Sequence, residues 1–160
     1  MKKVIRILAL ALVLVMLTGC GRGTKLFTCG DLTMLIPSGM KDVSDQSEFA
    51  GHTFALKSKE LVIFGLEERH LGDPLLEEYT LLSYTQEVIR GNGLSCVPLV
   101  RNNEDYTYFS YTCRFDDQDY RYLVAVYRTD ESFWMIQLSC LVEQYEEAAC
   151  FRYLDSVEFQ

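Results

Sequence analysis

Apolar and polar positions alternate along short runs of the chain, and this pattern predicts a protein built mainly from β-strands. The runs are rich in β-branched and aromatic residues, and turn-forming residues such as Gly30-Asp31 and Pro37-Ser38-Gly39 separate them. The polar stretch 41–50 predicts an irregular loop with room for one helical turn. The predicted strands cover residues 25–29, 32–36, 52–57, 61–69, 94–101, 105–115, 119–128 and 133–141, and a short edge strand covers 157–159.

Two segments have helical periodicity instead. In the first, Asp73 is a suitable N-cap, Pro74 occupies the first helical position, and apolar residues recur at the spacing of one helix face. Gly91-Asn92-Gly93 ends this helix, which we expect over about residues 73–90. A second helix over about residues 143–155 follows the last long strand.

The four strands between residues 94 and 141 are joined by turns too short for parallel crossovers, so they form an antiparallel meander. Their central members are apolar on both sides: Leu123 and Tyr127 point one way and Val124 the other. A sheet with one wet face would alternate cleanly between apolar and polar positions. Both faces should therefore be covered, one by each helix. This predicts the α+β class, as a three-layer α/β/α sandwich around a largely antiparallel sheet.

The first 20 residues follow a different pattern. Lys2, Lys3 and Arg6 precede an uninterrupted apolar run over residues 7–17, which is typical of a secretory signal. Leu17-Thr18-Gly19-Cys20 closes the run and is similar to the lipobox of a bacterial lipoprotein. We expect cleavage before Cys20, lipidation of Cys20, and anchoring at the outer (extracytoplasmic) face of the cell membrane. An ordinary cleavable signal, followed by an incidental cysteine, is the alternative.

The predicted organisation is a signal peptide over residues 1–19, a short lipid-anchored spacer over 20–24 and a single globular domain over 25–160. The signal takes three of the 15 basic residues and none of the 23 acidic ones, so the rest of the chain carries a net charge of −11. An acidic domain of this kind argues against nucleic acid as a partner, since nucleic-acid binding requires a basic face. The negative charge remains compatible with a basic partner.

The cysteines suggest one disulfide. With Cys20 lipidated, five remain. A tight turn at 116–118 would place Cys113 near Tyr122, and a tight turn at 129–132 would place Cys140 near Arg121, so these two cysteines would lie on opposite faces of the sheet. The last helix folds back over the strand before it, which brings Cys150 towards Cys140 and makes this the favoured pair. The alternative is that all five are small buried apolar residues.

No catalytic or metal-binding motif is found. His52 and His70 have no cysteine or carboxylate at ligand spacing, and Asp116-Asp117-Gln118-Asp119 lacks the glycine and glutamate of a calcium loop and predicts a hairpin turn. We expect no metal, no cofactor and no enzyme activity. Trp134 is expected in the core. Most tyrosines are expected as half-buried strand residues, with an exposed aromatic platform as the alternative.

The order of these elements resembles the PsbP-like domains. The resemblance rests on the hairpin that ends in Leu35-Ile36-Pro37-Ser38-Gly39-Met40, the central helix, the meander with Phe133-Trp134-Met135-Ile136, and the final Leu154-Asp155-Ser156-Val157-Glu158-Phe159. It implies the PsbP/Mog-like α/β/α sandwich, a fold found in PsbP, in Ran-binding Mog proteins and in small bacterial lipoproteins. Such proteins tend to be non-catalytic partners of larger assemblies, and no functional residue carries over.

Two functions remain open at this point. The first is a lipid-anchored accessory domain that binds another cell-envelope protein, which predicts an exposed apolar patch without a deep pocket. The alternative is a lipoprotein that binds a small ligand, which predicts a concave pocket with a few convergent polar groups.

Overall fold

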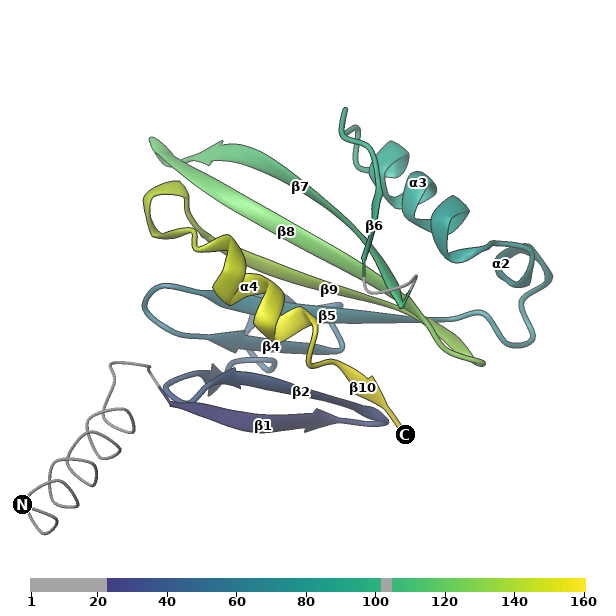
Figure 1. Cartoon of the computed structure of the whole chain (residues 1–160), viewed down its shortest axis with the longest axis horizontal. Helices are drawn as coiled ribbons and strands as arrows, with labels where there is room; N and C mark the ends of the chain where they lie inside the picture. Colours follow the sequence, from purple (N-terminus) through teal and green to yellow (C-terminus); the bar gives the residue numbers. More distant parts are fainter. Residues whose placement is uncertain (1–22, 102–104) are drawn as a thin grey trace, which may run out of the picture.

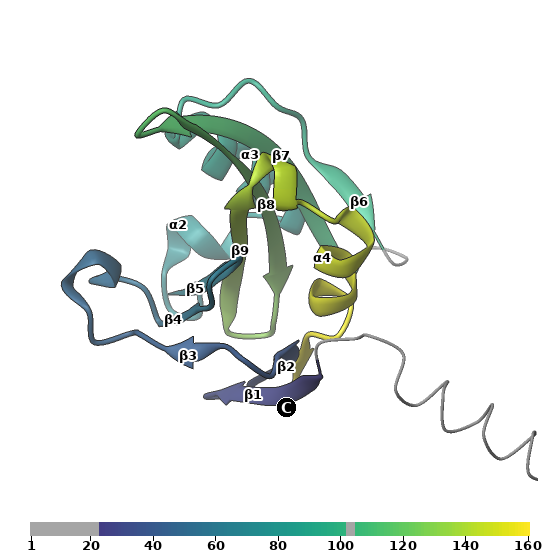
Figure 2. The ribbon, with the colours of Figure 1, turned by 90° about the vertical axis from the view of Figure 1, so that its left-hand side faces the viewer.

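Two antiparallel sheets form the framework of the protein. The computed structural model describes residues 23–101 and 105–160, and Figures 1 and 2 show how their elements are arranged. The larger sheet has seven strands in the order β3-β4-β5-β9-β8-β7-β6, and the smaller has three in the order β1-β2-β10. Neighbouring strands pair antiparallel throughout. The fold is therefore mixed α+β with mainly antiparallel sheets. The predicted signal peptide and Cys20 lie outside the described residues.

The observed strands agree with the alternation in the sequence. The larger sheet contains β3 (Lys41–Asp42), β4 (Phe54–Lys57), β5 (Val62–Arg69), β6 (Leu99–Arg101), β7 (Tyr106–Phe115), β8 (Gln118–Arg128) and β9 (Ser132–Leu141). The smaller sheet contains β1 (Thr24–Cys29), β2 (Leu32–Pro37) and β10 (Glu158–Phe159). Two strands differ from the prediction. Only the last three residues of the strand predicted over 94–101 form β6, and β3 begins the stretch 41–50 that was predicted as an irregular loop. Pro98 directly precedes β6 and has no N–H to donate to a ladder.

The prediction of one continuous helix over residues 73–90 is wrong. The chain forms α2 (Pro74–Glu77) and then α3 (Leu81–Gly91). Asp73 caps α2 as expected, because its Oδ1 accepts a hydrogen bond from the backbone N–H of Leu75 at 3.0 Å. A second cap then interrupts the run: the Thr80 side chain accepts from the N–H of Ser83, and the Ser83 hydroxyl accepts from the N–H of Thr80. This capping box starts a new helix.

The remaining helices are short. The loop after β3 holds one 3₁₀ turn, η1 (Ser47–Phe49), as the sequence allowed. The helix predicted over 143–155 is shorter than expected, because a 3₁₀ turn, η3 (Val142–Gln144), precedes α4 (Glu147–Leu154). No helix in the described part of the chain combines the length and the apolar character needed to cross a bilayer.

The turn between β7 and β8 sets the register of the meander. Asp116 and Asp117 have φ values of 48° and 59°, in the left-handed region, and together they form a two-residue turn that pairs Phe115 with Gln118. Cys113 therefore lies opposite Tyr120, and its predicted position opposite Tyr122 is wrong. A shift of two residues keeps every side chain on the same face. Cys140 lies opposite Arg121, as predicted.

Two apolar clusters lie on opposite faces of the larger sheet. The first joins that sheet to β2 and α4 and includes Met34, Leu123 and Leu154. The second joins the sheet to α3 and includes Tyr84 and Val124. Figure 2 shows α3 and α4 on different sides of β8 and β9. Leu123 and Val124 are successive residues of β8, so they lie on opposite faces of the sheet, and both are only 1% exposed. The centre of β8 is therefore buried on both faces. Trp134 is 4% exposed within the first cluster, as predicted.

Candidate functional site

The two histidines occupy separate places in the fold. The His52 ring lies 4.6 Å from the ring of Phe64, and its Nδ1 lies 3.1 Å from the carbonyl oxygen of Phe49. The His70 ring is buried against Phe133, where its Nε2 lies 3.1 Å from the carbonyl oxygen of Thr129. The Nδ1 atom of His70 is buried without a hydrogen-bond partner. Within residues 23–101 and 105–160, no group of three or more His, Cys, Asp or Glu side chains could hold a metal ion.

The cysteines of the last strand and helix are both buried. Burial raises the pKa of the Cys150 thiol to about 12, and the electrostatic effect of Cys140 is the next largest cause. Burial also raises the pKa of Cys140. Both groups are therefore uncharged thiols at neutral pH. The Cys140–Cys150 disulfide stays a prediction.

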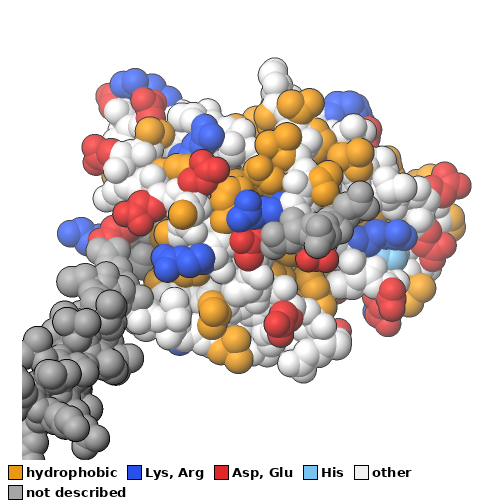
Figure 3. Space-filling model, in the orientation of Figure 1, with side chains coloured by type: hydrophobic (Ala, Val, Ile, Leu, Met, Phe, Trp, Pro, Cys, Tyr) orange, Lys and Arg blue, Asp and Glu red, His pale blue; other side chains and the backbone are white. Residues whose placement is uncertain are grey.

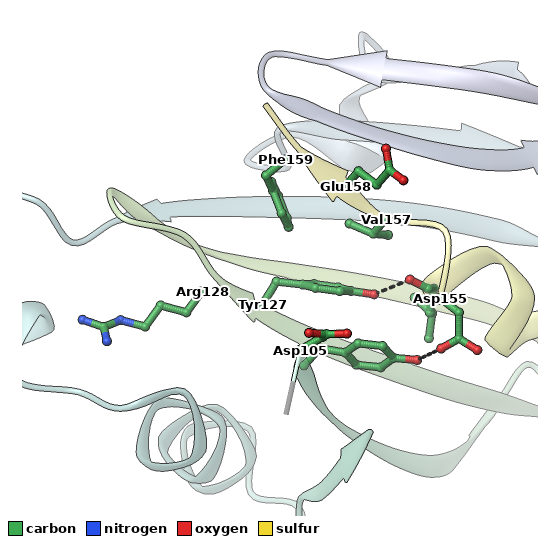
Figure 4. Close-up of a pocket in the computed structure, with 9 residues that line it drawn as sticks. Asp105, Tyr127, Arg128, Asp155, Val157, Glu158 and Phe159 are labelled. Carbon is green, nitrogen blue, oxygen red and sulfur yellow. Dashed lines mark hydrogen bonds between the residues drawn. The ribbon is translucent and has the colours of Figure 1, made fainter. Parts of the chain in front are cut away.

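A depression of about 270 Å³ lies where the C-terminal segment crosses β7 and β8. Figure 4 shows Tyr127 on its floor, with Val157 and Phe159 of the C-terminal segment above this ring. The Tyr127 hydroxyl donates a hydrogen bond of 2.8 Å to the carbonyl oxygen of Leu154. In the same view, Arg128 points away from Tyr127. The Tyr127 ring beneath the depression is only 4% exposed.

The polar groups around this depression bind one another. The Asp155 carboxylate accepts two hydrogen bonds of 2.9 Å from Arg101 and one of 2.6 Å from the Tyr106 hydroxyl. The Arg101 guanidinium also lies 3.8 Å from the centre of the Phe151 ring. Burial, followed by the hydrogen bond to Asp155, raises the pKa of Tyr106 well above its ordinary value. These contacts fasten the end of α4 to β6 and β7, and we interpret them as structural.

A second depression, of about 280 Å³, lies beside β3 and β4. Three lysines line it: Lys41, Lys57 and Lys59. Lys41 and Lys57 lie directly opposite each other in the β3–β4 ladder, where their positive charges repel each other. Glu48 offsets part of this charge, because its carboxylate lies 3.1 Å from Lys57 Nζ. The lysine side chains are exposed at the surface, so the depression has no buried polar group to orient a ligand.

The outer edge of β7 differs from both depressions. β6 pairs with β7 only from Tyr106 to Tyr108, so the stretch Phe109–Phe115, called here the β7 edge, has no strand beyond it among the described residues. Figure 1 shows the far half of β7 at the margin of the sheet. Figure 3 shows apolar side chains gathered over β6 and β7. The exposed apolar residues of this region are Val97, Leu99, Val100 and Phe115.

The sequence prediction missed both the Asp155 cluster and the β7 edge. Arg101, Tyr106 and Asp155 are far apart in the chain, and no motif links them. The edge was missed because a strand over 94–101 would have covered more of β7. The signal that could have revealed it is Pro98, which interrupts pairing at this position.

The comparisons with known proteins agree on the fold. A crystal structure from Bacteroides thetaiotaomicron VPI-5482 superposes with a TM-score of 0.59, at 12% sequence identity, over 88% of this chain. The solution structure of cyanobacterial PsbP (CyanoP) from Synechocystis sp. PCC 6803 superposes with a TM-score of 0.51, at 12% identity, over 89% of this chain and 96% of its own. The chain has a PsbP-like fold.

The PsbP-like fold confirms the resemblance inferred from the sequence. The match covers only 49% of the Bacteroides protein, so this chain spans about half the length of that structure. No family model matches the sequence. No curated protein matches it either. At 12% identity the likeness shows the fold alone, and any function must be argued from the site.

Proposed function

We propose that this PsbP-like protein is a lipid-anchored extracytoplasmic accessory domain that acts as a non-catalytic partner of another cell-envelope protein. The observation that carries the proposal is a set of exposed apolar side chains at this margin of the sheet: Leu99 and Val100 of β6, Val97 just before β6, and Phe115 at the end of the β7 edge. Val97 and Phe115 are 76% and 70% exposed. Exposed apolar side chains on a sheet edge are typical of protein–protein contact. The anchor would be Cys20, which holds the domain at the outer face of the membrane.

We also infer that the domain is a three-layer α/β/α sandwich with α3 on one face of the larger sheet and α4 on the other. The two apolar clusters support this layering. The smaller sheet packs beside α4 through β2, so the α4 side of the sandwich would contain strands as well as a helix.

The small-ligand alternative is less well supported. In the first depression, the Asp155 carboxylate is already bound by Arg101 and Tyr106, and the second depression is lined by exposed lysines. Neither offers the enclosed apolar wall with a few convergent polar groups that ligand sites use.

Surface cross-linking on intact cells tests the proposal. Tagged wild-type protein is cross-linked with a membrane-impermeant amine reagent, purified, and compared by quantitative mass spectrometry with residues 1–24 fused to an unrelated domain. This control carries the same anchor without the fold. We expect one envelope protein to be enriched with the wild type alone. If repeated experiments enrich no envelope protein, and the purified protein binds a small molecule saturably, the ligand-binding alternative would replace the proposal.

A further inference from the structure

The β7 edge presents backbone groups that no strand uses. β7 has ten residues, but β6 occupies only three of them. No other backbone hydrogen bond in the described part of the chain reaches Phe109–Phe115 from outside the sheet. In an antiparallel strand, alternate residues direct both N–H and C=O towards the outer side. The edge therefore offers a short row of donors and acceptors that match an added strand.

The segment before β6 forms no ladder hydrogen bonds with this row. After α3 ends, Leu94 and Cys96 pack against the apolar cluster beneath α3. Their packing there, together with Pro98, keeps this part of the chain from extending the ladder along β7. The β7 edge is thus open because of the local sequence, and it remains open over the half of β7 next to the turn.

The side chains of the β7 edge would support an added strand. Tyr111, Cys113 and Phe115 lie on one face of the sheet, and Thr112 and Arg114 lie on the other. Tyr111 stacks on Tyr122, with 4.8 Å between ring centres, which holds one side of the edge rigid. Phe115 is 70% exposed, so an apolar side chain on an incoming strand could bury it.

The negative charge near the β7 edge favours an added strand that is positively charged. The turn beside Phe115 carries Asp116, Asp117 and Asp119, whereas Arg114 is the one basic residue of β7. The Arg114 guanidinium nitrogens lie 3.6 Å from Oδ1 of Asp117 and 3.8 Å from Oδ1 of Asp119. This one positive charge offsets only part of the negative charge of the three carboxylates at the turn. The chain after residue 19 also carries a net charge of −11. A second copy would bring the same negative charge, which disfavours self-association through this edge.

We propose that the β7 edge binds an extended, positively charged segment of the partner protein as an additional β-strand. Strand addition of this kind takes its affinity from main-chain hydrogen bonds and its specificity from alternate side chains. The proposal rests on the proposed function, because it names how the envelope partner is recognised.

Hydrogen exchange with defined peptides tests the edge itself. The full-length protein, in a non-ionic detergent, is mixed with an acetylated and amidated peptide of four Val-Lys repeats. We expect amide hydrogen exchange in the proteolytic fragments of the protein that cover residues 109–115 to slow at least fivefold. A peptide of four Val-Glu repeats, and a Val-Lys peptide N-methylated at every second residue, should slow it less than twofold. Equal protection by the N-methylated peptide, protection confined to other strands, or no protection at 1 mM would overturn the proposal.

Two lysine substitutions provide a matched comparison. Phe115→Lys adds a positive charge and removes the apolar group at the edge, so the affinity for the Val-Lys peptide should fall at least tenfold. Leu75→Lys makes the same change on α2 at a residue that is 79% exposed and distant from β7 in the fold. It should leave the affinity within twofold. Both sites are exposed, so both variants should keep the wild-type circular dichroism spectrum. Equal losses in the two variants would contradict the proposal.

Photo-cross-linking in cells separates this proposal from the proposed function. A photoreactive amino acid replaces Thr112 in one strain and Leu75 in another. Capture of the cell-envelope partner from position 112, abolished by Phe115→Lys, supports both. Capture from position 75 alone leaves the proposed function standing and overturns the β7 edge. Peptide binding at the edge without capture of any envelope protein from either position retains the edge and overturns the proposed function.

Discussion

Gly65 lies on β5, an inner strand of the larger sheet, where it is directly opposite Phe54 in the β4–β5 ladder. A Cβ atom at residue 65 would lie 2.2 Å from Cε1 and 2.6 Å from Cζ of the Phe54 ring. Apolar carbons in contact are about 3.5–4.0 Å apart, so the ring would have to move by more than about 1 Å. Phe54 is 2% exposed and its ring centre is 4.8 Å from that of Phe27, which leaves little room.

We therefore expect Gly65→Ala to lower the free energy of unfolding by about 3 kcal/mol, the upper end of the range for overpacked cores. Urea unfolding of the purified protein, followed by far-ultraviolet circular dichroism, measures this change. Gly91→Ala is the control, because the residue ends α3 and its added Cβ would meet no atom within 4 Å apart from neighbouring parts of the same helix. It should be neutral or stabilise by up to about 1 kcal/mol.

A double substitution tests the stated cause. Phe54→Leu removes the ring that Gly65→Ala would strike, so the pair should be less destabilised than the sum of the single changes by at least about 1 kcal/mol. An unfolding free energy for Gly65→Ala within about 0.5 kcal/mol of the wild type, or strict additivity in the double variant, would refute the packing argument.

Three further predictions concern the C-terminal segment. Asp155→Ala should destabilise the protein by about 2 kcal/mol, because it leaves the buried Tyr106 hydroxyl without its acceptor. Glu131→Ala is the control: it removes an ion pair with Arg69 in which the Glu131 side chain is 60% exposed, so it should lower the free energy of unfolding by about 0.5 kcal/mol or less. Equal losses for the two variants in urea unfolding would contradict this difference. With thiols kept reduced, the raised pKa of Cys150 means that the unfolded chain loses this proton near its ordinary pKa of 9.0 and the folded chain only near about 12. Stability should therefore fall from pH 9 to pH 12 more steeply in the wild type than in Cys150→Ala, and parallel pH profiles would exclude the shift. Mass spectrometry of oxidised, non-reduced protein should show a Cys140–Cys150 cross-link, and its absence would exclude that pair.

Much of the strand pattern could be predicted because each strand has its own local signal. The apolar alternation in β7, β8 and β9 places their ends within two residues of the observed ones. The helix over 73–90 was mispredicted for a physical reason: its apolar stripe continues across residues 78–80, while the capping box of Thr80 and Ser83 starts a new helix there. Periodicity reports the face that a segment buries and does not detect a cap inside it.

The candidate site was harder to predict than the fold. The register of β7 depends on a turn in which Asp116 and Asp117 both have positive φ, a conformation that glycine and asparagine usually provide. The Asp155 cluster depends on contacts between β6, β7 and the end of α4 that no local pattern encodes. The open β7 edge results from a strand, β6, that begins later than predicted, and apolar residues such as Leu94 and Val97 gave no sign of this late start.

The mass and location of the mature protein test the central claim most directly. We propose that this PsbP-like domain lies outside the cell and is held there by lipid on Cys20, and every proposal about an envelope partner depends on that position. Membranes from cells that express the full chain should yield a protein whose first residue is Cys20 with a covalent diacylglycerol, and Cys20→Ser should release it from the membrane fraction. An unmodified chain that begins at Met1 and is recovered from the cytoplasm would contradict the account.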